Sequence, residues 1–482
     1  MNSFNFLDFQ HKSVHVVGIS GAEGYAILSF LNRKGFTHLT GHDLHEGEWL
    51  KQSFDLSHVS LPKKIREIQF QQLQSLPVTF HLGPSYLTDI TSAELIFTGQ
   101  NWFAHPENAI LADLRSQGKP FGFLIQLYFA LSPAPIVAVT GTNGKTTLST
   151  LLAHLLETAG KPYLVSGNDR YQPQVLDRLE SLDPSGYFVL EVSNRQLMEI
   201  NQGPHIGIIT NIREDHLNEH GSFEEYIRTK YRLFRFQTDK DWAIINTDDP
   251  ICRRFLETCP AKPLPYSVES LPANGAGPVA TGYALHRNDA RISLFQESDV
   301  HIPGKHNISN ILAASCAAFL MGIPPETIEG AIRTFRGVKN RIEYIDTVNS
   351  IAFYDDLAST NPAATEAALS AFSHPIILIC GGDLKGNRSA YENLARRFTK
   401  SVKHLFIITS PVSSLIKQLV GNHSDVFEVS SLEAAVIQAY STASPHDTIL
   451  LSPSGAGFYS QFIARQKGYR RLIRDLSRQI GK

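Results

Sequence analysis

The chain has 482 residues, too many for a single hydrophobic core, so about two to four domains are expected. Hydrophobic residues make up 42% of the chain and charged residues 19%, which is ordinary for a globular protein. Lys and Arg number 44 against 46 Asp and Glu, so the chain lacks the basic excess that is typical of proteins that bind nucleic acid.

The cysteines and the N-terminal region indicate a reducing compartment. Cys252 and Cys259 are spaced too widely for a zinc site, and Cys316 and Cys380 lie far along the chain, so free thiols are expected. The chain starts without an apolar signal-peptide core, and no run approaches the roughly 18 apolar residues of a membrane span. We expect a cytoplasmic monomer with no stable membrane association and no nucleic-acid partner.

The first predicted elements are a strand at 14–20, a glycine-rich turn, a helix at 25–35 and a strand that ends at Asp43. Strand, turn, helix, strand and acid in this order resemble a dinucleotide-type βαβ unit. The glycines are spaced differently from the usual fingerprint, so a tight turn in any doubly wound sheet stays equally open. They are Gly18, Gly21 and Gly24.

Strands alternate with helices throughout, which predicts an α/β protein. We expect a Rossmann-like domain at 1–126, a central P-loop ATPase-type domain at 127–337 and a second Rossmann-like domain at 338–482. The main predicted strands after the first two are 93–99, 187–193, 206–212, 242–249, 375–382, 404–410 and 448–455.

A phosphate-binding loop is predicted at 141–147, GTNGKTT, between an apolar strand and a helix. The standard pattern has four residues between its first glycine and the Gly-Lys pair, whereas only two residues separate Gly141 from Gly144 here. Backbone N–H groups at a helix N-terminus favour anions. The residues expected to bind ATP are Gly141, Thr142, Asn143, Gly144, Lys145, Thr146 and Thr147.

This short loop resembles the signature of the Mur ligase family, the ATP-dependent amide-forming enzymes of peptidoglycan precursor synthesis. The resemblance implies ATP and Mg²⁺ as cofactors and an acyl-phosphate intermediate. It also implies that the substrates are a UDP-N-acetylmuramoyl-peptide and an amino acid, and that 1–126 binds the UDP-sugar. Asn168, in the segment SGND, matches a family position that contacts this substrate.

Glu191 ends an apolar strand, where an acid resembles a Walker-B carboxylate. The segment LEVSNRQL matches the family pattern apart from Asn194, which stands in place of a serine, and the match implies that Ser193 contacts the substrate. The resemblance implies one magnesium at Thr146 and Glu191. The segment 210–234 matches a further family motif, and it implies a second magnesium near Glu191, His216 and Lys230. By itself, His216 is better explained as a surface or capping residue.

Lys230 lies on a predicted helical stripe with Phe223, Ile227 and Phe234. A lysine on such a stripe either extends toward solvent or is buried at a cost in free energy. In the Mur ligase family the matching lysine is carbamylated, which turns the cation into an anion and would remove that cost. Both interpretations stay open from the spacing alone.

Two further segments resemble nucleotide-binding motifs of the family. In GKHNISN, the resemblance implies that Asn307 and Asn310 contact the adenine ring, although helix N-capping by Asn307 is an alternative. In NRIE, it implies that Arg341 binds the γ-phosphate across the domain cleft. Asp356, in FYDDLASTNPAAT, is also assigned to the ATP site.

The C-terminal block resembles the D-glutamate-adding members of the family. Thr360, Lys385 and Ser452 match positions that the resemblance assigns to the amino-acid site. Three positions depart from the pattern and leave the amino acid open: Ala358, Gly457 and Ala464.

The resemblance implies a ligase that adds glutamate, in the D form, to UDP-N-acetylmuramoyl-L-alanine. A Mur-type ligase that uses L-glutamate or another acyl substrate is the main alternative. A folylpolyglutamate synthase would begin with the ATPase domain, and a GTPase would carry an Asn-Lys pair, which this chain lacks. A catalytically dead relative would have lost Lys145, Glu191 or Lys230. His216 is also a candidate to orient the incoming amine, so the catalytic set is Lys145, His216, Lys230 and Arg341.

Overall fold

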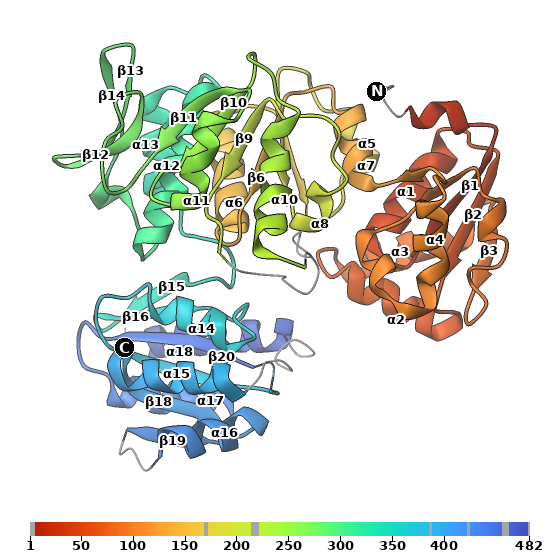
Figure 1. The fold of residues 1–482 in the computed structure, drawn as a ribbon. Helices are drawn as coiled ribbons and strands as arrows, with labels where there is room; N and C mark the ends of the chain where they lie inside the picture. The colour runs from red at the N-terminus through yellow and green to blue at the C-terminus, as the bar shows by residue number, and fades with distance from the viewer. Residues whose placement is uncertain are drawn as a thin grey trace. The chain divides into compact units, whose positions relative to one another are not determined.

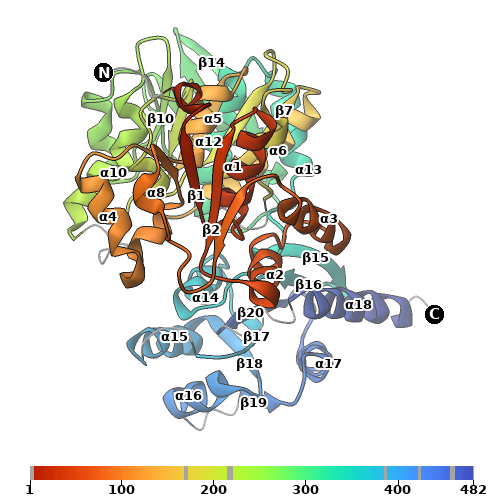
Figure 2. The same ribbon diagram turned by 90° about the vertical axis from the view of Figure 1, so that its right-hand side faces the viewer.

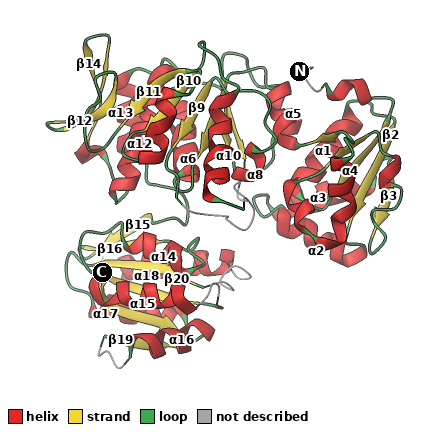
Figure 3. Cartoon of the chain, in the orientation of Figure 1, coloured by secondary structure: helices red, strands yellow, loops and turns green. Residues whose placement is uncertain are grey.

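The computed structural model describes residues 5–167, 172–213, 221–384, 388–421, 425–455 and 462–480. It contains three mainly parallel sheets with flanking helices, so the predicted α/β class is confirmed (Figures 1 and 3). The chain divides into two compact units, Met1–Leu294 with Leu312–Ile328, and Phe295–Ile311 with Glu329–Lys482. The predicted boundaries at 126 and 337 stay predictions. In the described part of the chain, no helix is both long and apolar enough to cross a bilayer.

The first sheet has five parallel strands in the order β3-β2-β1-β4-β5, and Figure 2 shows β1 beside β2. Its strands are β1 Ser13–Val17, β2 His38–Asp43, β3 Thr79–Leu82, β4 Leu95–Phe97 and β5 Phe121–Gly122. The helices of this region are α1 Ala22–Arg33, α2 Gly47–Ser57, α3 Lys63–Gln74, α4 Ala109–Ser116 and α5 Leu124–Leu131.

Asp43, the acid that ends β2, is fully buried and holds the glycine turn. Its Oδ2 accepts a hydrogen bond of 2.7 Å from the backbone N–H of Ser20. A Cβ on Gly24 would lie 2.1 Å from the carbonyl oxygen of Gly18, so the turn needs glycine for close packing. These contacts give Asp43 a structural role and favour the tight-turn interpretation.

The central sheet has nine strands in the order β14-β13-β12-β11-β10-β9-β6-β8-β7. The strands are β6 Ile136–Thr140, β7 Tyr163–Gly167, β8 Tyr187–Glu191, β9 Ile206–Ile209, β10 Trp242–Asn246, β11 Lys262–Tyr266, β12 Gly275–Val279, β13 Gly282–Arg287 and β14 Ala290–Gln296. Strands β6 and β9 are buried throughout, as their continuous apolar runs predict for a parallel sheet covered on both faces. The helices are α6 Lys145–Thr158, α7 Leu176–Leu179, α8 Asn194–Leu197, α10 Phe223–Arg235, α11 Pro250–Arg253, α12 Lys305–Leu320 and α13 Pro325–Thr334.

The third sheet has six strands in the order β15-β16-β20-β17-β18-β19, with β15 antiparallel to β16 and the other pairs parallel. The strands are β15 Glu343–Val348, β16 Ile351–Asp355, β17 Ile376–Gly381, β18 Val402–Ile408, β19 Val426–Val429 and β20 Thr448–Ser454. Helices α14 Pro362–Leu369, α15 Arg388–Ser401, α16 Pro411–Val420, α17 Leu432–Thr442 and α18 Phe462–Ile480 connect or follow them.

Candidate active site

The loop between β6 and α6 has the backbone shape that its glycines predict. Gly141 has φ 146° and Gly144, the residue that precedes α6, has φ 89°, and L side chains rarely adopt either value. A Cβ on Gly141 would also lie 1.9 Å from Thr210 Oγ1. The first turn of α6 therefore begins at Lys145, and its N–H groups lie next to the loop.

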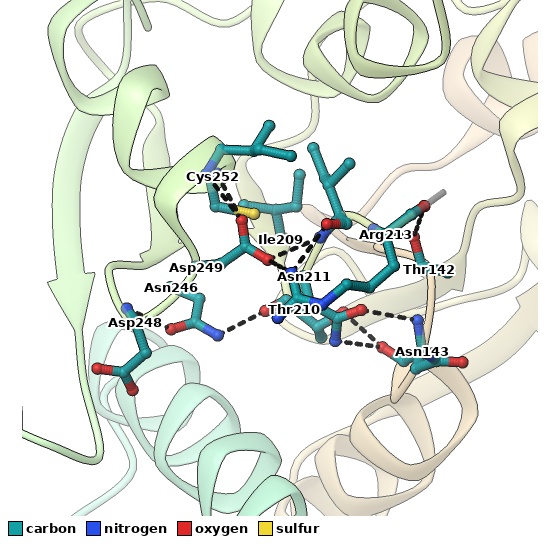
Figure 4. Close-up of polar contacts among 12 residues, drawn as sticks. Thr142, Asn143, Ile209, Thr210, Asn211, Arg213, Asn246, Asp248, Asp249 and Cys252 are labelled. Carbon is teal, nitrogen blue, oxygen red and sulfur yellow. Dashed lines mark hydrogen bonds and ion pairs between the residues drawn. The ribbon is translucent and has the colours of Figure 1, made fainter. Parts of the chain in front are cut away.

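Residues 210 and 211, which follow β9, fasten this loop (Figure 4). Asn143 N–H donates to Asn211 Oδ1 at 3.0 Å, and Asn211 Nδ2 donates back to the Asn143 carbonyl at 3.1 Å. Thr142 N–H donates to the Asn211 carbonyl at 2.9 Å, and Thr210 Oγ1 donates to the Asn143 carbonyl at 2.6 Å. Asn211 matched the family motif, but its role in holding the loop was not predicted from the sequence.

Behind this contact, Asp249 supports the same segment (Figure 4). Its buried carboxylate accepts from the N–H of Ile212 at 3.1 Å and of Cys252 at 3.0 Å, and it forms an ion pair with Arg213. Asp249 was not among the predicted site residues. The dipeptide Asp249-Pro250 is an N-cap signal for a helix that could have identified it.

Lys145 extends across the loop. Its Nζ donates to the carbonyl of Gly141 at 3.0 Å and to the carbonyl of Thr142 at 2.9 Å. Thr146, one position further along α6, is buried. The ammonium group is thus held over the loop by two of its carbonyl oxygens.

Lys230 reaches the same loop from α10. The helix spans Phe223–Arg235, as the stripe predicts, and Lys230 is 1% exposed, so extension toward solvent is excluded. Its Nζ donates to the Gly141 carbonyl at 3.1 Å and to Thr140 Oγ1 at 3.3 Å, and it lies 5.2 Å from the centre of the Tyr226 ring. Lys145 and Lys230 thus donate to the same carbonyl oxygen, which concentrates positive charge at the loop.

Glu191 ends β8, the strand next to β6, and pairs in register with Val139. Its side chain is 2% exposed. Two residues further on, Ser193 caps α8, because its Oγ accepts from the Gln196 N–H at 3.3 Å. The structure therefore places Glu191 at the strand end beside the loop and gives the Ser193 hydroxyl a capping role.

Several predicted residues cannot be placed. Asn168, His216, Lys385 and Gly457 lie outside the described residues, and so does the side chain of Ala464.

In the second compact unit, α12 begins at Lys305, whereas N-capping by Asn307 would require it to begin at Ile308. The capping interpretation is therefore wrong. Gly304, with φ 99°, precedes the helix, and Asn307 Nδ2 donates back to the Pro303 carbonyl at 2.6 Å. Asn307 and Asn310 are both buried.

The other predicted residues of this unit lie near the carboxyl ends of β16 and β20. Asp356 Oδ2 lies 2.7 Å from Ser452 Oγ, and Asp356 Oδ1 accepts from the Ile342 N–H at 3.2 Å. Burial raises the pKa of Asp356 to about 7. Ser452 is fully buried, Thr360 is buried, and Arg341 is exposed.

A cavity of about 710 Å³ opens beside the glycine turn of the first sheet. Gly18 and Gly21 line one side of it, and Ser193 and Gln196 line another. Trp49 of α2 also borders it with 69% of its surface exposed. Within the first compact unit, this cavity is large enough for a nucleotide-sized ligand.

Known proteins resemble this chain over its whole length. Residues 139–318 match the Mur ligase middle domain, and residues 340–455 match the Mur ligase, glutamate ligase domain. The UDP-N-acetylmuramoylalanine–D-glutamate ligases of Caldanaerobacter subterraneus subsp. tengcongensis and Thermoanaerobacter sp. are 34% and 31% identical to it, and each alignment covers 98% of this chain and all of the relative.

Solved structures support the same fold. The UDP-N-acetylmuramate–alanine ligase of Thermotoga maritima has a TM-score of 0.59 at 19% identity, and the alignment covers 95% of this chain and all of that structure. A pseudomurein peptide ligase type C from Methanothermus fervidus has a TM-score of 0.55 at 20% identity, with the same coverage of this chain and all of that structure. This chain belongs to the Mur ligase family of ATP-dependent, amide-forming enzymes.

Proposed function

We propose that this protein adds D-glutamate to UDP-N-acetylmuramoyl-L-alanine, with hydrolysis of ATP to ADP and phosphate, in peptidoglycan precursor synthesis. The observation that carries the proposal is the loop 141–147, on which Lys145 and Lys230 both donate to the Gly141 carbonyl. The glutamate ligase domain match and the full-length relatives support D-glutamate as the amino acid.

The chemistry requires activation of a carboxylate, which is a poor acyl donor. Transfer of a phosphoryl group from ATP gives an acyl phosphate, and attack by the amine of glutamate then forms the amide and releases phosphate. In this proposal Lys145 and the N–H groups at the start of α6 neutralise phosphate charge. Arg341, Asn307, Asn310 and Asp356 keep their predicted places in the ATP site as proposals.

The residues beside the loop fit a magnesium ion. Mg²⁺ prefers oxygen ligands, and Thr146 and Glu191 supply a hydroxyl and a carboxylate next to the proposed phosphate position. Among the described residues, no group of three His, Cys, Asp or Glu side chains is placed to bind a metal, so substrate oxygens would complete the shell. When bound, the ion would neutralise phosphate charge.

Lys230 is proposed to be carbamylated. The ammonium first loses one proton, and addition of CO₂ to the resulting amine forms an N–C bond and releases a second proton, which leaves a carbamate anion in place of a buried ammonium. Such a group would supply a second acid beside Glu191, and His216 is proposed to complete this site and to orient the amine. Native mass spectrometry tests the modification. We expect an added mass of one CO₂ in wild type that is absent in Lys230→Arg, and an unmodified wild type in bicarbonate buffer would contradict the proposal.

The amino-acid site is proposed at Thr360, Lys385 and Ser452, and the acyl-substrate site at Asn168 and Ser193. Because Ser452 is fully buried, it would act through Asp356, to which its hydroxyl donates a hydrogen bond of 2.7 Å. The Ser193 hydroxyl would keep its capping role and contact the substrate as a second function. A cytoplasmic monomer with domains at 1–126, 127–337 and 338–482 is part of the same proposal.

Product analysis tests the proposed function. Incubation with ATP, Mg²⁺, UDP-N-acetylmuramoyl-L-alanine and D-glutamate should give a product heavier by one glutamyl residue. The same incubation with L-glutamate tests the alternative amino acid. A product that forms only with L-glutamate would contradict D-glutamate as the substrate.

A further inference from the structure

A buried acid in the wall of the cavity beside the glycine turn forms a salt bridge that involves none of the predicted site residues. Glu199 follows α8, its side chain is 7% exposed, and it lines the cavity. Arg115 Nη2, from α4, lies 2.9 Å from each of the two Glu199 carboxylate oxygens. Gln100, which also lines the cavity, donates its amide N–H to Oε1.

The surroundings fix both partners of this salt bridge. The Arg115 guanidinium lies 5.3 Å from the ring centres of both Phe103 and Phe123. Gln126 Nε2 donates to the Glu199 carbonyl at 3.0 Å, while Gln126 Oε1 accepts from the Phe123 N–H at 3.1 Å. A guanidinium packed against two rings and a glutamate whose backbone carbonyl is hydrogen-bonded form a preorganised pair.

The segment that contains Glu199 also connects to the phosphate-binding loop. Arg232 of α10 donates to the Leu197 carbonyl at 2.7 Å and to the Ile200 carbonyl at 2.9 Å. The same helix carries Lys230, whose Nζ contacts the loop. The wall of the cavity and the loop are thus held by one helix.

The charges in the cavity explain why Glu199 needs a cation. Glu23 and Glu199 both line the cavity, and burial raises the pKa of each carboxyl group. Gln196 Nε2 contacts Glu23 Oε1 at 3.4 Å, and Arg115 pairs with Glu199. In its ionised form, Glu199 without Arg115 would place an unpaired negative charge in the cavity and repel the diphosphate of a UDP-linked substrate.

We propose that Arg115 is a positioning residue for the nucleotide-sugar substrate, because it neutralises and orients Glu199 in the wall of the cavity. The inference rests on the proposed function. It assigns Arg115 no contact with the reacting atoms, so its loss should weaken binding of the nucleotide-sugar without a matching effect on ATP.

Four variants test this role: Arg115→Gln, Glu199→Gln, the double variant, and Lys34→Gln as a control. Lys34 pairs with Glu180 at 2.6 Å, away from the cavity lining, and links the same two parts of the chain. The readouts are the KM values for UDP-N-acetylmuramoyl-L-alanine and for ATP, the melting temperature, and the Kd for UDP alone. Trp49 and Trp102 both line the cavity, so tryptophan fluorescence reports UDP binding.

We expect Arg115→Gln to raise the nucleotide-sugar KM and the UDP Kd by about tenfold or more, with an unchanged ATP KM. The double variant should recover most of the lost affinity, because it leaves no unpaired carboxylate. Lys34→Gln should leave the nucleotide-sugar KM and the UDP Kd unchanged. The inference is overturned if Arg115→Gln stays within twofold of wild type, if the double variant binds no better than the single one, or if Lys34→Gln shows the same loss. If wild type binds UDP but releases no phosphate, the proposed function fails, and the UDP Kd still tests Arg115.

Discussion

Replacement of Asn211 by alanine should loosen the phosphate-binding loop without unfolding the protein. The change removes the two side-chain hydrogen bonds to Asn143, of 3.0 and 3.1 Å, but leaves the backbone bond from Thr142 N–H to the Asn211 carbonyl. Each neutral hydrogen bond contributes about 0.5–1.5 kcal/mol, and both of these lie near the surface. We therefore expect the free energy that holds the loop in its ordered conformation to fall by about 1–2 kcal/mol.

That loss corresponds to a rise of roughly 5- to 30-fold in the KM for ATP, because ATP binding must then order the loop. Phosphate release at varied ATP concentration measures it, and a thermal melt should shift little, since Asp249 still holds the Ile212 N–H. Asn211→Asp keeps the acceptor but places a carboxylate near the Asn143 carbonyl, so it should raise the KM for ATP more than Asn211→Ala does. An ATP KM within twofold of wild type in Asn211→Ala would refute the role given to the hydrogen bonds between Asn211 and Asn143.

Three further predictions concern single residues. Lys145→Ala should abolish phosphate release with a nearly unchanged melting temperature, and a large melting shift would mean that the lysine is structural. Gly141→Ala should destabilise the fold by about 1–3 kcal/mol in chemical denaturation, because its φ is 146° and the new Cβ meets Thr210 Oγ1. Gly330→Ala, in α13 with open space around it, is the matched control and should be neutral or stabilising. Burial raises the pKa of Asp355 to about 7, so its contribution to stability is full below about pH 4 and is lost as the pH rises through 7. Asp355→Asn should therefore show a smaller fall in melting temperature between pH 5 and pH 8 than wild type, and an equal fall would argue against this titration.

Local patterns predicted the parts of the site that depend on a single element. Period-3.6 spacing placed Lys230 on the buried face of α10, and glycines in a strand–loop–helix context predicted the loop at 141–144. Apolar runs that end in polar residues also located Glu191 at the end of β8.

Contacts between distant segments were not predictable in the same way. Asn211 and Asp249 act on the loop through backbone groups that only the sheet order brings together, since β9 lies between β6 and β10. The side chain of Asn307 suggested a cap for a helix that begins at Ile308, but α12 begins at Lys305, directly after Gly304. Arg115 and Glu199 are 84 positions apart, and neither belongs to a recognisable motif.

The central claim is that the enzyme adds D-glutamate, and an assay of phosphate release tests it most directly. Wild type with ATP, Mg²⁺ and UDP-N-acetylmuramoyl-L-alanine should be assayed against a panel of D- and L-amino acids, with kcat/KM measured for each. The account predicts that D-glutamate has the highest kcat/KM, despite the departures at Ala358, Gly457 and Ala464. No phosphate release with either enantiomer of glutamate, or a higher kcat/KM for another amino acid, would contradict it.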